Sequence, residues 1–97
     1  MSREVVWHEA AERVFKAEFP AGLQDAFIRA LKQIAVYEVP ALASTRHGLP
    51  FDNAVWKLKA KDEAGQWRVV YVKGYTEAVY VVNAYCRASV LLTPLRP

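Results

Sequence analysis

Two lysines in the second half of the chain are spaced so that they could hold a phosphate together. Lys57 and Lys59 alternate with Trp56 and Leu58, and successive side chains of a β-strand point to opposite faces. In a strand, the lysines therefore share one face and the apolar side chains share the other. Cations gathered on a sheet surface stabilise the negative charge of a phosphate, so this pattern predicts an anion-binding face.

A hairpin after these lysines is expected to bring an arginine beside them. The loop is predicted at residues 62–65, where Gly65 is free to take a positive φ. Closing this loop places Arg68 on the face that carries the lysines. The expected cross-strand pairs are Lys61–Gln66, Lys59–Arg68 and Lys57–Val70. The expected apolar face carries Trp56, Leu58, Trp67, Val69 and Tyr71.

Charge is distributed unevenly along the chain. The formal net charge is +3, yet residues 1–45 hold five Lys or Arg against six Asp or Glu, while residues 46–97 hold eight against four. The strand-rich half is therefore the basic half, which favours a polyanion or an acidic partner on the sheet. Lysines solvated on an exposed sheet face are the commoner explanation of such charges, and both interpretations stay open at this point.

Length and composition predict a single globular domain spanning residues 1–97. The chain has 97 residues and 54% hydrophobic residues, enough for one core and too few for two. No apolar run approaches the length of a membrane span, and acidic residues follow Arg3 closely, unlike the start of a signal peptide. A cytoplasmic location is expected. The one cysteine, Cys86, is expected to be a small packed residue.

The pattern of apolar residues predicts both helices and strands. The predicted elements are a strand at 3–8, helices at 9–18 and 21–37, and three antiparallel strands between 55 and 85. Pro20 ends the first helix, and the stretch 40–53 lacks periodicity and contains prolines, so a loop is expected there. A second tight turn is expected at Gly74-Tyr75. Residues 88–97 are expected either to fold back over the sheet or to form a short helical turn.

Several motifs occur in a characteristic order along nearly the whole chain. They are Gly48, Val55-Trp56-Lys57-Leu58-Lys59, Gly65-Gln66-Trp67-Arg68-Val69-Val70-Tyr71, Ala78-Val79-Tyr80-Val81-Val82-Asn83-Ala84-Tyr85, and Thr93-Pro94. Each motif is short, but the ordered set with these gaps is fairly specific. By this set the chain resembles the RelE/ParE superfamily of bacterial type II toxins, and most of all its phage-type, HigB-like branch.

The resemblance implies an α+β, RelE-like fold. Such a fold is an antiparallel sheet, made of an N-terminal strand and a three-stranded C-terminal meander, with two helices packed on one face. The resemblance also implies the toxin of a type II toxin–antitoxin system, an endoribonuclease that cleaves mRNA in the ribosomal decoding site and inhibits translation. Such enzymes use no metal and no other cofactor. The implied partners are the ribosome, mRNA and a cognate antitoxin, a helix-turn-helix protein.

The resemblance also implies which residues do the chemistry. Cleavage needs a base for the ribose 2′-hydroxyl, cations for the phosphate and a proton donor for the leaving 5′-oxygen. Arginine stays charged, so Arg68 and Arg87 suit phosphate binding. A lysine crowded by other cations loses its proton more readily, which favours Lys57 or Lys59 as the general base. The implied catalytic set is Lys57, Lys59, Arg68 and Arg87.

Further residues are expected to contact the RNA. Tyr85 shares the strand alternation of Arg87 and could stack on a base, although a half-buried aromatic residue of the sheet is an equal interpretation. His47 stands beside Arg46 in the expected loop and could approach a phosphate, although a lone loop histidine more often faces solvent. The expected RNA-binding set is Arg46, His47, Lys61, Lys73 and Tyr85.

Two other functions are compatible with the same fold. A ParE-like gyrase poison would act by binding a protein and would cleave no RNA. A catalytically inactive, phage-derived relative would keep the fold and the binding of an antitoxin or another protein. Because fold does not decide function, the residues of the site must separate these alternatives.

Overall fold

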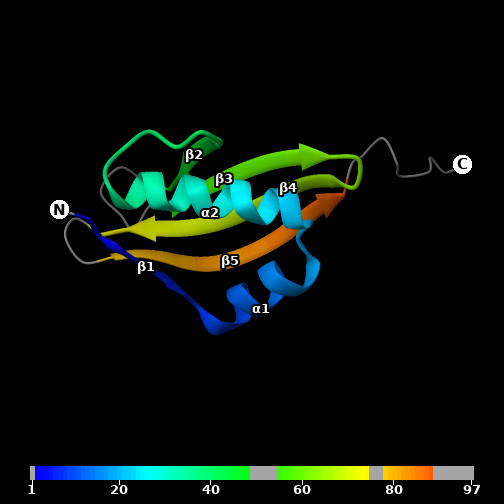
Figure 1. The fold of residues 1–97 in the computed structure, drawn as a ribbon, viewed down its shortest axis with the longest axis horizontal. Coiled ribbons are helices and arrows are strands. Elements are labelled where there is room, and N and C mark those ends of the chain that lie inside the picture. Colours follow the sequence, from blue (N-terminus) through cyan, green and yellow to red (C-terminus); the bar gives the residue numbers. More distant parts are fainter. Residues whose placement is uncertain (1, 49–54, 75–77, 89–97) are drawn as a thin grey trace, which may run out of the picture.

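The computed structural model describes residues 2–48, 55–74 and 78–88. In chain order they form β1 (Glu4–Trp7), α1 (Glu9–Glu18), α2 (Ala21–Ala35), β2 (Ala43–His47), β3 (Val55–Asp62), β4 (Gly65–Lys73) and β5 (Ala78–Ala88). Both helices lie on the same side of the sheet (Figure 1). The expected α+β class is therefore confirmed, and the arrangement is consistent with a RelE-like fold.

The strands lie in the order β1-β5-β4-β3-β2. The pairs from β2 to β5 are antiparallel, whereas β1 runs parallel to β5. The expectation of a wholly antiparallel sheet is thus wrong for this one pair. The reason lies in the path of the chain. After β1 the two helices carry the chain to the far edge of the sheet, and three antiparallel steps bring β5 back beside β1 in the same direction.

The segment expected to be a long loop contains strand β2. It pairs antiparallel with β3, with Thr45 opposite Lys57 and His47 opposite Val55. Its sequence shows no apolar alternation because β2 is an edge strand with mostly exposed side chains. A hydrogen bond of 2.8 Å joins the hydroxyls of Ser44 and Tyr71 on the helix side. Pairing with β3 and the hydrogen bond to Tyr71 hold β2 in the sheet, although its sequence lacks the apolar pattern that identifies an inner strand.

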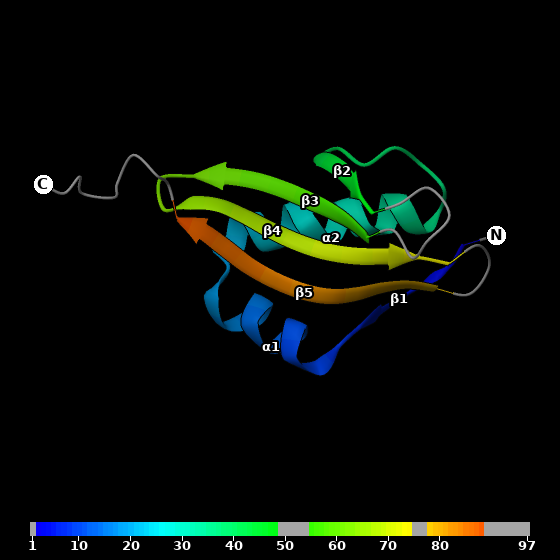
Figure 2. The ribbon, with the colours of Figure 1, turned by 180° about the vertical axis from the view of Figure 1, so that it is seen from behind.

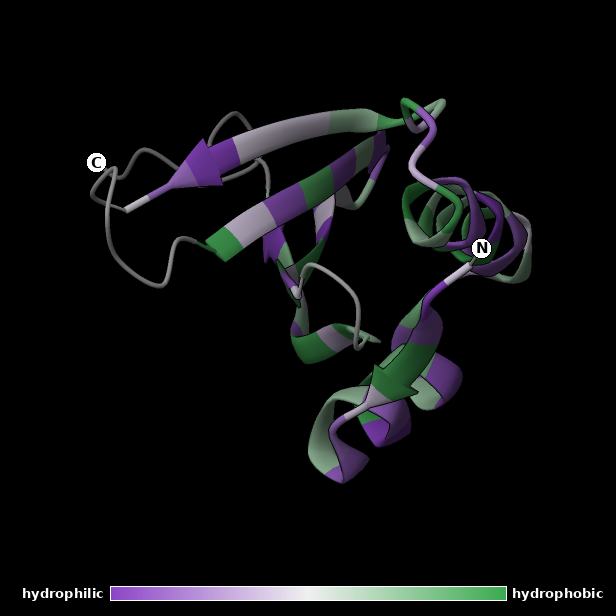
Figure 3. Cartoon of the chain, turned by 90° about the vertical axis from the view of Figure 1, so that its left-hand side faces the viewer, coloured by the Kyte–Doolittle hydropathy of each residue, from purple (hydrophilic) through white to green (hydrophobic). Residues whose placement is uncertain are grey.

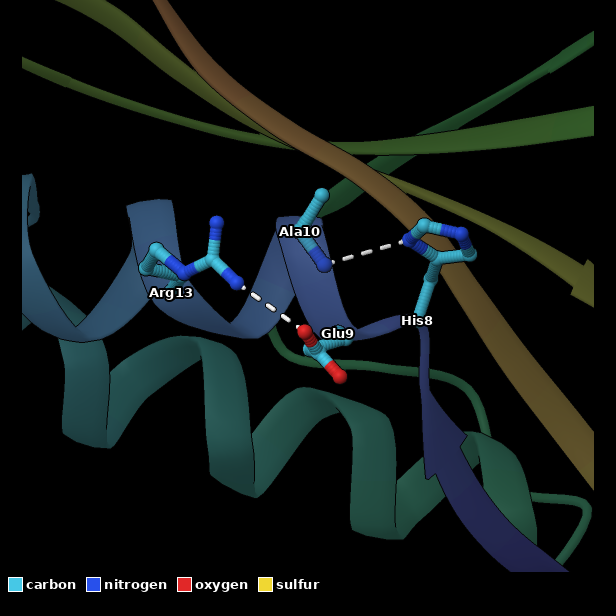
Figure 4. A network of polar contacts seen from close by, with 4 residues as sticks. All are labelled: His8, Glu9, Ala10 and Arg13. Carbon is cyan, nitrogen blue, oxygen red and sulfur yellow. Dashed lines mark hydrogen bonds and ion pairs between the residues drawn. The ribbon is translucent and has the colours of Figure 1, made fainter.

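Helix α1 has the predicted bounds and a local cap at its start. The imidazole Nδ1 of His8 accepts a hydrogen bond from the backbone N–H of Ala10 at 3.2 Å (Figure 4). The side chains of Glu9 and Arg13, four residues apart, form an ion pair at 3.0 Å. Neither described helix is long and apolar enough to span a bilayer.

Helix α2 ends at Ala35, two residues before the predicted end. Tyr37 has a positive φ of 63°, which an α-helix cannot continue through. The guanidinium of Arg3 donates to the carbonyl of Ile34 in the last turn and to that of Gly74, and it lies 4.1 Å from the centroid of the Tyr37 ring. Arg3 therefore ties the start of β1 to the end of α2.

The core lies between the two helices and one face of the sheet (Figure 3). Its buried members are Ala11, Phe15, Phe19, Phe27, Ala30, Leu31, Ile34, Ala35, Leu58, Trp67, Val69, Tyr71, Val79, Val81 and Ala84. The five residues expected on the apolar face all lie in this core or pack against it. The face that carries the lysines must therefore be the opposite one.

The β3–β4 hairpin has the predicted register. All three expected pairs are present, namely Lys61–Gln66, Lys59–Arg68 and Lys57–Val70. The loop is shorter than expected because Asp62 pairs with Gly65, which leaves two residues to make the turn. The carboxylate of Asp62 accepts from the N–H of Ala64 at 2.9 Å and from the indole N–H of Trp67 at 2.8 Å. These bonds fix the turn and hence the register.

Parts of two expected features lie outside the described residues. The turn expected at Gly74-Tyr75 involves residues 75–77, and the C-terminal segment includes residues 89–97.

Gly65 allows β4 and β5 to approach closely. Its φ is +144°, and an added Cβ would lie 2.3 Å from the carbonyl oxygen of Arg87. We expect Gly65→Ala to lower the free energy of unfolding by roughly 3 kcal/mol, from backbone strain and displacement of β5. Thermal unfolding measures the change.

Gly22→Ala is the matched control for this substitution. Nothing lies within 4 Å of a Cβ at Gly22, so the same chemical change in α2 should stabilise the protein by about 0.5–1 kcal/mol. Equal melting temperatures for the two variants would contradict the close approach of β4 and β5.

Candidate functional site: a cationic sheet face

The face of β3, β4 and β5 that points away from the helices is not covered by a described element (Figure 2). We call it the open face. It carries Lys57, Lys59 and Arg68, which we call the cation cluster. Lys59 lies directly opposite Arg68 across the two strands, and all three side chains are half-buried. The shared face of Lys57, Lys59 and Arg68 that the alternation predicts is therefore present in the structure.

A β-bulge in β5 adds two further residues to this face. Up to Val81, the odd-numbered residues of β5 point into the core. The register shifts opposite Val70 and Tyr71, and Val82 and Asn83 are both exposed there. Beyond this point Ala84 points into the core, and the odd-numbered residues point outward. The bulge therefore places Tyr85 opposite Arg68, and Arg87 opposite Gln66, on the open face.

Arg68 is held in place by neighbours on both sides. Its Nε donates to the side-chain oxygen of Gln66 at 2.7 Å. One terminal nitrogen donates to the hydroxyl of Tyr85 at 3.4 Å, and the guanidinium carbon lies 6.0 Å from the centroid of that ring. These contacts orient the guanidinium and leave other N–H groups available for an anion.

The hydroxyl of Tyr85 is more acidic than that of an ordinary tyrosine. The hydrogen bond from Arg68 is the largest cause and lowers the pKa of Tyr85, burial opposes it, and Lys57 lowers the pKa further through a hydrogen bond and its charge. A phenol shifted in this direction gives up its proton more readily near neutral pH. Tyr85 thus lies on the open face in an environment suited to proton transfer.

His47 lies on the same face, at the end of β2. It is opposite Val55, two residues before Lys57. Partial desolvation of the ring, followed by the charges of the cation cluster, lowers the pKa of His47. A shift in this direction favours the neutral imidazole, the form that can accept a proton. The structure brings His47 to the cluster on a strand, whereas the sequence placed it in a loop.

Two residues of the expected RNA-binding set lie on the other face. Arg46 is opposite Trp56 on the helix side. The ammonium of Lys73 lies 4.0 Å from the centroid of the Trp56 ring. Burial, followed by the charges of Arg3 and Arg46, lowers the pKa of Lys73. The structure therefore does not bring Arg46 and Lys73 to the cation cluster, because each is one residue out of phase with the open face.

Lys61 and Arg87 form a second, more exposed row beside the cluster. Lys61 is opposite Gln66, and Gln66 is opposite Arg87. Gln66 also binds Arg68, so it connects this row to the cluster. The expected pair Lys61–Gln66 placed Gln66 on this face, but its hydrogen bond with Arg68 was not among the expectations.

The open face is strongly positive. No Asp or Glu occupies an open-face position in the described parts of β3, β4 and β5, and none of the basic side chains there forms an ion pair with a described residue. Among the described residues, no group of three His, Cys, Asp or Glu side chains is arranged to hold a metal ion. The geometry can thus bind an anion and offers two side chains for proton transfer.

Comparison with known proteins identifies the family. A model of the family described as phage derived protein Gp49-like (DUF891) matches residues 15–94. No curated protein and no solved structure matches the chain. The matched region begins within α1 and extends past β5, so it includes the cation cluster, Tyr85 and Arg87. The chain therefore belongs to the phage-derived Gp49-like family.

Proposed function

We propose that this protein is the toxin of a type II toxin–antitoxin pair and that it cleaves mRNA on the ribosome. The observation that carries the proposal is that Arg68 and Lys57 act on the hydroxyl of Tyr85, with Lys59 opposite Arg68 on the same uncovered face. Membership of a phage-derived family and an arrangement consistent with a RelE-like fold agree with this assignment.

The proposed reaction is attack of a ribose 2′-hydroxyl on the adjacent phosphorus. The bond from phosphorus to the 5′-oxygen breaks, which leaves a 2′,3′-cyclic phosphate on one product and a 5′-hydroxyl on the other. Negative charge grows on the phosphate oxygens in the transition state, and the cation cluster is placed to stabilise it. Arg68 contributes a charged fork that can bind two oxygens at once.

Two side chains on this face are suited to move the protons. His47, with its lowered pKa, takes the proton of the 2′-hydroxyl, and Tyr85 gives its proton to the leaving 5′-oxygen. This division differs from the sequence expectation, which gave the role of base to Lys57 or Lys59. In the structure these lysines lie where they can neutralise the phosphate, and they need not exchange protons.

The proposed partner that controls the toxin is an acidic antitoxin segment that covers the open face. Charge complementarity favours such a segment because the described open-face positions of β3, β4 and β5 hold no carboxylate. Exposed apolar side chains lie at the other end of the same face, at Val6, Tyr80 and Val82. A partner with carboxylates and apolar residues would match both parts.

Expression of the chain alone is expected to stop bacterial growth and to cut messages that are being translated. The measurements are growth and mapping of RNA ends, together with cleavage of mRNA on purified ribosomes. A His47→Ala/Tyr85→Phe double variant should lose cleavage, and coexpression of the partner should restore growth.

Other outcomes would assign a different function. Normal growth with intact transcripts at strong expression would contradict the nuclease and favour an inactive relative. Supercoiling defects with intact messages would contradict it in favour of a gyrase poison.

A further inference from the structure

The basic residues of the open face form three rows across the sheet. Along β3 they are Lys57, Lys59 and Lys61, two residues apart. The strand rise places successive rows about 6.6 Å apart. That separation is comparable with the distance between consecutive phosphates of an extended single strand of RNA. The spacing of the lysines along β3 thus matches the spacing of phosphates along an RNA strand.

The side chains of the three rows differ in how exposed they are and in their neighbours. In the middle row, Lys59 faces Arg68, and Tyr85 lies beyond them on β5. In the row nearest the β3–β4 turn, Lys61 and Arg87 flank Gln66 and are exposed. Of the residues suited to proton transfer, Tyr85 lies in the middle row and His47 lies beyond the Lys57 row, opposite Val55. The third row has only cations and an amide.

Gln66 connects the middle row to the third row. Its side-chain oxygen accepts from the Nε of Arg68 at 2.7 Å, so its NH₂ group can donate to a ligand between the rows. Apart from the ring of Tyr85, no bulky apolar side chain occupies a described open-face position of these two rows. A continuous backbone can therefore pass from one row to the next.

We infer that single-stranded RNA runs along β3, with three consecutive phosphates at the three rows, and that Lys61 and Arg87 form a phosphate subsite next to the row where cleavage occurs. This inference rests on the proposed function in taking RNA as the ligand. It changes the role of Arg87 from catalysis to positioning. Lys61 and Arg87 hold the adjacent phosphate and thereby fix which bond lies beside Tyr85.

The test is binding of RNA that cannot be cut. Fluorescent 2′-O-methyl oligonucleotides of two to six nucleotides lack the attacking hydroxyl, and no ribosome is needed. Affinity for the intact protein should rise up to four nucleotides, which carry three phosphates, and then level off. With Lys61→Ala/Arg87→Ala, affinity should level off one nucleotide earlier. The slope of log affinity against log salt, which is negative, should also become less steep by ~0.7, the value for one lost phosphate contact to a single strand.

Arg29→Ala/Lys32→Ala is the matched control. It removes the same charge from exposed positions of α2, on the other side of the sheet. Its salt slope and its length dependence should equal those of the intact protein. This control separates a local subsite from a general effect of net charge.

Three results would overturn the inference. The first is an unchanged length dependence in the Lys61→Ala/Arg87→Ala variant, and the second is an equal loss in the α2 control. The third is binding of a polyglutamate peptide of matched charge as tightly as the RNA, which would assign the rows to an acidic protein segment. If the oligonucleotides bind as expected but no transcript is cut, the inferred binding of RNA along β3 is supported and the nuclease proposal fails.

Discussion

Arg68→Ala is expected to abolish RNA cleavage while the protein stays folded. Arg68 lies at the centre of the cation cluster, opposite Lys59 and in contact with Tyr85. Its removal takes away a fixed charge aimed at the phosphate, a loss that typically slows a reaction by about 10²–10³. Its side chain is only half-buried and outside the core. The free energy of unfolding should therefore change by no more than about 1 kcal/mol.

Cleavage on ribosomes and the melting temperature should be measured on the same preparation. Arg68→Lys keeps the charge but loses the planar fork, so its cleavage should fall between those of the intact protein and Arg68→Ala. Arg29→Ala, on the exposed side of α2, is the control for loss of a positive charge. Early melting of Arg68→Ala would refute the face assignment, and full activity at normal stability would refute the phosphate role.

The same variant has a second, spectroscopic readout. The hydrogen bond from Arg68 is the largest cause of the lowered pKa of Tyr85. Arg68→Ala should therefore raise the pKa of Tyr85 towards its ordinary value. Phenolate absorbance followed against pH, with Tyr85→Phe as the subtraction control, would detect this shift. An unchanged titration of Tyr85 in Arg68→Ala would contradict the hydrogen bond between the two side chains.

The cation cluster could be predicted because it depends only on local rules. Alternation within β3 places Lys57 and Lys59 on one face, and a short turn ending in Gly65 fixes the register of β4. An error of two residues in the loop length left the register unchanged, because Asp62 and Gly65 form one more pair of the same ladder.

The face of Arg87 could not be predicted because it depends on a bulge. The residues around Val82 carry no local signal for an extra residue in the ladder, and a one-residue shift exchanges the two faces. Burial in the core decides on which face Arg87 lies. Val81 before the bulge and Ala84 after it are both buried, and only a shift between them satisfies both.

The position of His47 depends on long-range pairing. Ser44 and Arg46 form part of a strand here because β3 offers a free edge, not because of their own propensity. Once β2 is paired, alternation divides its residues between the faces. His47 then joins the cation cluster and Arg46 does not.

Trp67→Ala is expected to unfold the domain or to leave it marginally stable. Trp67 is 8% exposed, and its ring centroid lies 4.8 Å from that of Phe19, at the junction of the two helices. Its indole N–H also holds Asp62 in the turn. Loss of this packing should cost roughly 3–5 kcal/mol, a large part of the stability of a small domain.

Trp67→Phe provides the matched comparison. It keeps most of the contact with Phe19 but loses the hydrogen bond to Asp62, so it should cost about 1–2 kcal/mol. In thermal unfolding, the melting temperature should decrease from the intact protein to Trp67→Phe and again to Trp67→Ala.

Activity then separates the structural residue from the chemical one. Trp67 lies next to Arg68 but points to the opposite face, so Trp67→Ala should lose cleavage only through loss of the folded state. An osmolyte that favours the folded state should restore much of its cleavage, whereas no osmolyte should restore cleavage by Arg68→Ala. If the osmolyte refolds Trp67→Ala and cleavage does not return, Trp67 has a role at the open face that the observed alternation does not allow.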